Sequence, residues 1–95
     1  MMTLAFSELA QQELEDARDY YNLQQENLGE RFKEHIKESI DNIQEFPLLY
    51  PKINDVLYRV VVHKFPYSIF YIVDENRIVI ISIAHQNRKP FYQVD

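Results

Sequence analysis

The stretch LYRVVVHKFPYSIFYIVDENRIVIISIA, residues 57–84, decides the fold. It contains three runs rich in β-branched and aromatic residues, 57–63, 67–73 and 78–84, and these residue types favour strands. The connections between the runs have three and four residues, which is short enough for hairpins. The stretch therefore predicts an antiparallel meander of three strands.

Upstream of residue 57 the apolar residues recur with the period of a helix. Ser7 is a suitable N-cap for the first helix, and Asn27 with Glu30 resembles a capping box at the start of the second. Pro47 ends the second helix near Phe46. The short connection between the helices predicts an antiparallel hairpin. The apolar stripes are Ala10, Leu14, Ala17 and Tyr21, then Leu28, Phe32, Ile36, Ile40 and Ile43.

Residues 3–6 predict a short fourth strand at the edge of the sheet. Neither the helices nor the sheet can bury an apolar face alone, so the helical hairpin is expected to pack on the sheet. The predicted fold class is α+β, with an N-terminal short strand and an antiparallel helical hairpin on a three- to four-stranded antiparallel sheet. A chain of 95 residues has room for one domain, spanning 1–95.

The composition excludes several classes of protein. The chain contains no cysteine, which rules out a disulfide scaffold, a thiolate metal site and cysteine catalysis, and fits a reducing compartment. The N-terminal residues lack the basic and apolar regions of a signal peptide. No apolar run approaches the roughly 20 residues needed to span a bilayer. We therefore expect a cytoplasmic protein without a membrane partner.

The net charge of -5 is unevenly distributed. Residues 1–55 contain 5 basic and 12 acidic side chains, whereas residues 56–95 contain 5 basic and 3 acidic ones. An acidic surface repels phosphate backbones, so the chain alone is not expected to bind DNA directly. A local basic site in the C-terminal part remains compatible with this balance, because salt screens exposed charges beyond about 8–10 Å.

Polar residues that can carry chemistry gather at one predicted edge of the sheet. The first and third strands of a meander run the same way, so His63, Lys64 and His85 lie near one another, together with Tyr67 and the tail 86–92. Such a set suits phosphate contacts or acid–base work, although strand ends also collect polar residues for solubility alone. The acidic run at 13–19 is interpreted as the solvent face of a helix. No metal-ligand spacing and no glycine-rich loop are present, so neither metal nor cofactor is expected.

Six segments, in this order along nearly the whole chain, resemble the RelE/ParE toxins of bacterial type II toxin–antitoxin modules. They are Phe6-Ser7-x-x-Ala10-x-x-x-Leu14, Tyr20-Tyr21, Leu28-Gly29-x-Arg31-Phe32, Phe46-Pro47-x-x-Tyr50-Pro51, Phe65-Pro66-Tyr67-Ser68-Ile69-Phe70-Tyr71 and Ala84-His85-x-x-Arg88-x-Pro90-x-Tyr92. The resemblance implies the same fold that the periodicities predict.

The resemblance also implies a choice between two activities. RelE-like members cut mRNA on the ribosome with basic side chains from the sheet and an aromatic residue from the tail, whereas ParE-like members act on DNA gyrase. Arg59 and Tyr92 match the cleaving pattern. Val61, Ser68 and Gln86 stand where cleaving members have basic residues. Because the cations needed to stabilise a phosphorane are few, the resemblance favours the ParE-like branch.

Three functions follow as hypotheses: a ParE-like inhibitor that binds a partner protein, a ribosome-dependent mRNA endoribonuclease with a reduced catalytic set, and a member that has lost toxicity. In each, a cognate antitoxin is the expected partner. If the chain is an enzyme, the candidate catalytic residues are Arg59, His85, Arg88 and Tyr92, with His85 as acid or base. Alternatively, Arg88 has a structural role and pins the tail to the sheet through a carboxylate or backbone carbonyls.

Overall fold

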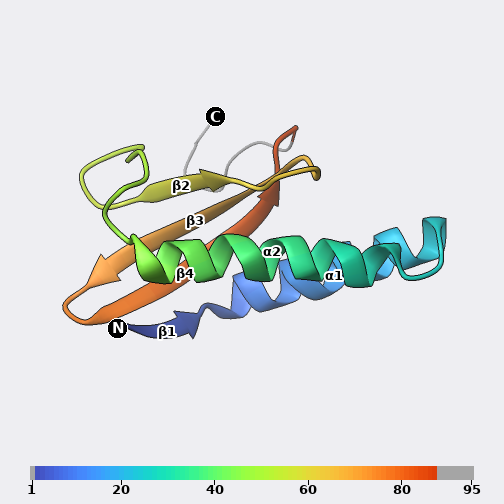
Figure 1. Ribbon diagram of the computed structural model, residues 1–95, viewed down its shortest axis with the longest axis horizontal. Helices are drawn as coiled ribbons and strands as arrows, with labels where there is room; N and C mark the ends of the chain where they lie inside the picture. The colour runs from blue at the N-terminus through green and yellow to red at the C-terminus, as the bar shows by residue number, and fades with distance from the viewer. Residues whose placement is uncertain (1, 88–95) are drawn as a thin grey trace.

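The structure is a computed structural model that describes residues 2–87. Within that range the element order is β1 (Thr3–Phe6), α1 (Glu8–Gln24), α2 (Leu28–Glu45), β2 (Tyr58–Val61), β3 (Tyr67–Asp74) and β4 (Arg77–His85). The helices form an antiparallel pair beside one twisted sheet (Figure 1). The predicted α+β class, helical hairpin and N-terminal strand are confirmed. The first strand of the meander is shorter than predicted, because pairing with β3 ends near Val62.

The sheet is mixed, which corrects the prediction of an antiparallel one. Its strand order is β1-β4-β3-β2, and β1 pairs with β4 in parallel. The chain reverses direction between α1 and α2, between α2 and β2, and at each hairpin of the meander (Figure 1). After these four reversals β4 runs in the same direction as β1. Parallel pairing of these two strands is therefore a consequence of the helical hairpin.

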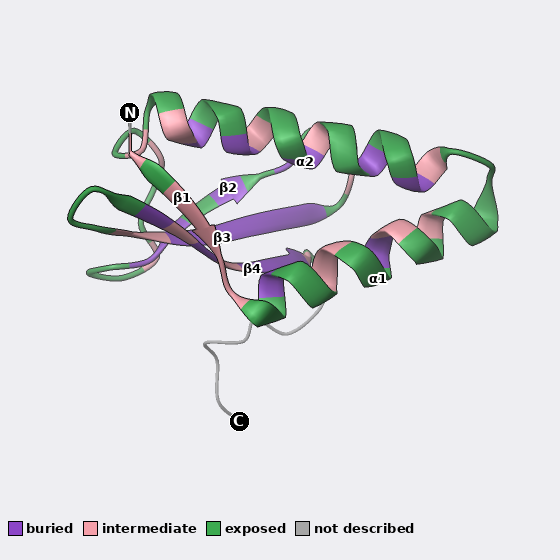
Figure 2. Ribbon diagram, turned by 90° about the horizontal axis from the view of Figure 1, so that it is seen from below, coloured by how far each residue is buried: buried purple, intermediate pink, exposed green. Residues whose placement is uncertain are grey.

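The main core lies between the helices and the inner face of the sheet, the face toward α1 and α2. Figure 2 shows the buried residues on the sides of the helices and strands that face each other. Phe32 of α2 is at the centre of a ring cluster, with its ring centroid 4.9 Å from that of Tyr67 and 5.2 Å from that of Phe65. Tyr21 of α1 joins the same cluster, 5.3 Å from Phe32. These rings connect both helices to the sheet.

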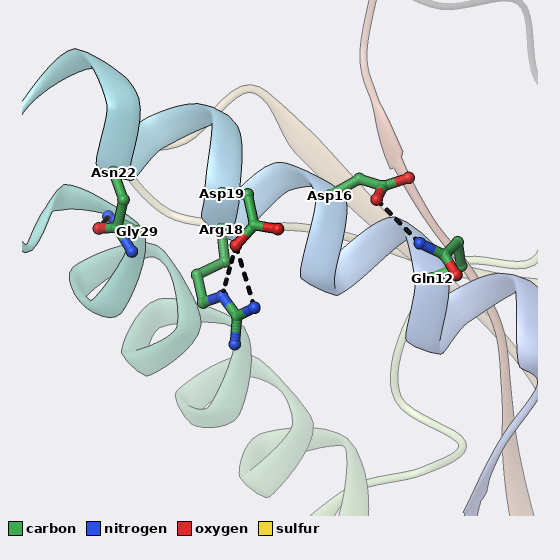
Figure 3. A network of polar contacts seen from close by, with 6 residues as sticks. All are labelled: Gln12, Asp16, Arg18, Asp19, Asn22 and Gly29. Atoms are coloured by element: carbon green, nitrogen blue, oxygen red, sulfur yellow. Dashed lines mark hydrogen bonds and ion pairs between the residues drawn. The ribbon is translucent and has the colours of Figure 1, made fainter.

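The two helices begin in different ways. Ser7 caps α1 as predicted, because its Oγ accepts a hydrogen bond of 3.0 Å from the N–H of Ala10. The capping box predicted for α2 is wrong: Asn27 has a left-handed backbone with φ 65° and makes no side-chain cap. The N–H of Gly29 instead donates to Oδ1 of Asn22 on α1 at 2.7 Å (Figure 3). An amide of the neighbouring helix thus satisfies an N-terminal donor of α2.

A bulge in β4 changes which side chains face the helices. Tyr71 pairs with Ile80 and Phe70 with Ser82, so Ile81 is an extra residue on β4. It lies where β1 ends, and Ser7 Oγ donates to the carbonyl oxygen of Ile81 at 2.7 Å. Before the bulge the even-numbered residues of β4 face the helices, and beyond it the odd-numbered residues do.

In residues 2–87 neither helix is long and apolar enough to cross a membrane.

Candidate functional site

Arg59 of β2 lies on the outer face of the sheet, the face opposite the helices. It pairs with Phe70, whereas its neighbours Tyr58 and Val60 are buried in the main core. Its Nε donates to Oγ of Ser68 at 3.2 Å. The serine therefore stands beside the arginine, where the cleaving pattern has a second cation. An arginine that is held to a neutral serine provides limited charge for stabilising a phosphorane.

The rest of the described outer face is largely apolar. Leu57, Phe70 and Ala84 form a second buried cluster, with Ile53, Ile72 and Ile81 packed against it. Val61, which also replaces a basic residue of the cleaving pattern, is 59% exposed at the edge of this face. The three cluster residues are buried, so the exposed apolar surface here is that of Val61 and of the partly buried Ile53, Ile72 and Ile81.

His85 lies on the inner side of the sheet, at the end of β4. It pairs with the core residue Tyr67, and their ring centroids are 5.2 Å apart in an edge-to-face arrangement. Its Nδ1 accepts a hydrogen bond of 3.0 Å from the N–H of Asn87. The bulge at Ile81 produces this placement, because it shifts the alternation of β4 by one residue.

The structure therefore separates the two candidate catalytic residues that it describes. Arg59 and His85 lie on opposite faces of the sheet. Arg88 and Tyr92 lie outside the described residues. At the predicted polar edge, His63 lies near His35 of α2, with ring centroids 6.3 Å apart, and Tyr67 contacts His85.

Sequence reasoning missed the role of Glu13. This residue belongs to the acidic run for which the sequence predicts a solvent-facing side of a helix. Its carboxylate instead reaches the edge of β4 that β1 leaves unpaired. Oε1 accepts hydrogen bonds from Ser82 Oγ at 2.7 Å and from the N–H of Ile83 at 2.9 Å. Both donors follow the point where β1 stops pairing with β4. The helical spacing of residue 13 gave no signal of this contact, because the bulged edge exists only in the folded sheet.

A pocket of about 490 Å³ opens beside this edge of β4. It brings His85 together with two carboxylates of α1, and none of the described residues that line it is a lysine or arginine. The lining residues are Glu13, Asp16, Ala17, Tyr20, Tyr67, His85 and Asn87.

Among residues 2–87, no group of three or more histidine, cysteine, aspartate or glutamate side chains is arranged to hold a metal ion. The site region therefore contains an arginine held to a serine on an apolar face, and a histidine in an acidic pocket on the other side.

Comparisons with known proteins give one family model and several solved structures of similar fold. Residues 4–90 match a family model described as the ParE toxin of the type II toxin–antitoxin system parDE. Comparison with curated proteins gives no match. Solved structures of similar fold include a chromosomal ParDE toxin–antitoxin system from P. aeruginosa, with a TM-score of 0.79 and 19% identity over 90% of this chain and 96% of that one.

Two structures of the E. coli RelE system have the same fold. The intact RelBE toxin–antitoxin complex gives a TM-score of 0.69 and 20% identity, covering 93% of this chain and 100% of that chain. The isolated RelE toxin gives 0.68 and 21%, covering 97% of this chain and 92% of that chain. The similar folds thus include toxins in complex with their antitoxins.

Proposed function

Because the chain belongs to the ParE toxin family of type II toxin–antitoxin systems, we propose that it arrests bacterial growth by binding a protein target, DNA gyrase, in the cytoplasm. A cognate antitoxin neutralises it. The observation that carries this proposal is the separation of Arg59 from His85 on opposite faces of the sheet. Cleavage by 2′-OH attack needs a proton acceptor and cations around one phosphate. A protein-binding inhibitor needs neither.

The outer face supplies a surface suited to this activity. Val61 and the partly buried isoleucines beside it can be covered by a partner protein, and Arg59 provides a polar contact at the rim. The net charge of -5 makes ribosomal RNA an unfavourable target for the molecule as a whole. The resemblance to ParE-like members supplies the identity of the target, gyrase.

The first test expresses the chain in a bacterial host and measures growth, DNA supercoiling by gyrase and transcript integrity. We expect growth arrest with impaired supercoiling and intact transcripts. Cleavage at translated codons would instead support the ribosome-dependent endoribonuclease, and normal growth would support a member without toxicity.

For a nuclease, His85→Ala and Tyr92→Phe should each lower cleavage by about 10²-fold. For the proposed inhibitor, Tyr92→Phe should leave growth arrest intact.

A matched pair of variants tests the outer face. Val61→Glu places a charge on the proposed binding surface and should abolish growth arrest without changing the melting temperature, because the side chain is exposed. Leu23→Glu is the control: Leu23 is 88% exposed near the end of α1, far from the outer face, and its variant should remain toxic. Equal toxicity of both variants would remove the outer face from the proposed mechanism.

A further inference from the structure

We propose that His35 of α2 and His63, which follows β2 closely in the chain, form a binding site for a divalent metal ion of the Zn²⁺ class. The two imidazole rings come from segments far apart in the sequence, and the fold brings their centroids to 6.3 Å from each other. Imidazole nitrogen is a protein ligand shared by Zn²⁺, Ni²⁺ and Cu²⁺. The inference does not depend on the target of the proposed toxin.

The first argument is that the ring nitrogens of both histidines are available. Within residues 2–87 neither His35 nor His63 takes part in a hydrogen bond or an ion pair. In contrast, Nδ1 of His85 accepts a hydrogen bond of 3.0 Å from the N–H of Asn87. A neutral imidazole has one nitrogen with a free lone pair. The pair can therefore bind a metal ion without breaking an existing bond.

The second argument is that packing fixes the places of the two rings. The centroid of His35 lies 5.4 Å from that of Phe65, which belongs to the ring cluster of the main core. The backbone is fixed on both sides of His63, because the N–H of Val62 bonds to β3 at 2.9 Å and Lys64 adopts a left-handed turn with φ 70°. Ligands that the fold already holds in place lose little conformational freedom when the ion binds.

The third argument is distance. With Zn–N bonds of about 2.0–2.1 Å each ring centroid lies about 3.2 Å from the metal, so two histidines of a tetrahedral site have centroids about 5 Å apart. The observed 6.3 Å is longer by about 1 Å, and rotation of the exposed His63 side chain covers this difference. Within residues 2–87 no third histidine, cysteine or carboxylate completes the set, so water occupies the remaining positions of the ion.

An ion at this site links α2 to the connection between β2 and β3. The two histidines meet only in the folded chain, so the ion binds the folded state more tightly and stabilises it. The sequence-based expectation of no metal relied on ligand spacing along the chain. That criterion does not detect ligands that tertiary structure brings together.

The first experiment titrates the full chain with ZnCl₂ and, separately, with MgCl₂, and follows backbone amides by NMR. We expect shifts centred on residues 35 and 63 with one Zn²⁺ per chain, and none with Mg²⁺, which prefers oxygen ligands. His35→Gln and His63→Gln should each lower the Zn²⁺ affinity by about tenfold or more, because one ligand remains. His85→Gln, which changes the third histidine of the chain, is the control and should alter the affinity by less than about twofold.

Three results would overturn the proposal. The first is the lack of a saturable response up to about 1 mM Zn²⁺, or an equal response to Mg²⁺. The second is full affinity in both His35→Gln and His63→Gln, which would show that the two rings bind ions independently. The third is a loss of affinity in His85→Gln that matches theirs, which would move the ion to the edge of β4.

The second experiment measures thermal unfolding with and without Zn²⁺. At a concentration tenfold above its dissociation constant, the ion should raise the melting temperature of the wild type by about 5 °C or more. His63→Gln should melt like the wild type in the absence of metal, because its side chain is exposed, and should gain nothing from Zn²⁺. A gain that persists in this variant contradicts the assignment of His63 as a ligand.

Discussion

The hydroxyl group of Tyr71 links the centre of the sheet to the loop that follows α2. Its ring is fully buried and stacks on Tyr58 with centroids 4.8 Å apart, and its hydroxyl donates to the carbonyl of Pro47 at 2.7 Å. Burial is the main cause that raises the pKa of this hydroxyl above its ordinary value. Tyr71 therefore fixes the position of the loop through its hydroxyl and affects stability at high pH through its burial.

We predict that Tyr71→Phe lowers the free energy of unfolding by about 1–2 kcal/mol at neutral pH, because the Pro47 carbonyl loses its donor. Tyr20→Phe is the control, since its side chain is largely exposed, and should change stability by less than about 0.5 kcal/mol. Urea unfolding of the three proteins measures both effects. A Tyr71→Phe protein as stable as the wild type would show that the bond contributes nothing.

The same variant has a predicted pH dependence. The folded-state pKa of Tyr71 is raised above that of the unfolded chain, about 10, so its contribution is fully present below pH 10 and is lost as the pH rises toward the folded pKa. Tyr71→Phe removes this contribution. The free energy of unfolding of the variant should therefore fall less steeply above pH 10 than that of the wild type. The fall that remains in the variant comes from groups such as Tyr21, whose pKa is also raised by burial.

At the scale of elements, the contact between α1 and α2 depends on the absence of a side chain at Gly29. A Cβ at this position would overlap the backbone carbonyl of Arg18 and lie 2.7 Å from the side chain of Asn22. The helices therefore lie close together at Gly29, and Asn22 can accept the Gly29 N–H there.

Gly29→Ala should consequently destabilise the protein by about 2 kcal/mol or more, although alanine is the better helix former by about 1 kcal/mol. Thermal unfolding followed by circular dichroism measures the change. Ser39→Ala, at a half-buried position farther along α2, is the matched control and should be close to neutral. A stabilised Gly29→Ala protein would mean that the two helices can separate without cost.

At the scale of the whole molecule, the ring cluster around Phe32 joins both helices to the sheet. Phe32 is fully buried and contacts Tyr21, Phe65 and Tyr67. We predict that Phe32→Ala costs about 3–5 kcal/mol, a large part of the stability of a small domain. Helical circular dichroism and tyrosine fluorescence should still report one coincident transition. Separate transitions would show that the helical hairpin and the sheet unfold independently.

The sequence by itself determined the elements. The apolar period of 3.6 predicted both helices, and runs of β-branched and aromatic residues predicted the meander, because these patterns depend on neighbours within one element. The strand at residues 3–6 was predicted as well. Ser7 as N-cap and the end of α2 before Pro47 were also predictable, since caps and proline act locally. The parallel pairing of β1 with β4 was deducible in principle, by following chain direction through the helical hairpin.

Only the tertiary structure decided which polar residues share a site. Strict alternation from Ile78 and Ile80 would have placed His85 on the outer face with Arg59, but the extra residue Ile81 moves it to the helix side. A single bulge leaves no mark in an aliphatic run such as 78–81, because every residue there suits either face. Glu13 reaches the edge of β4 for the same reason: its hydrogen-bond donors become available only where the strand pairing ends in three dimensions.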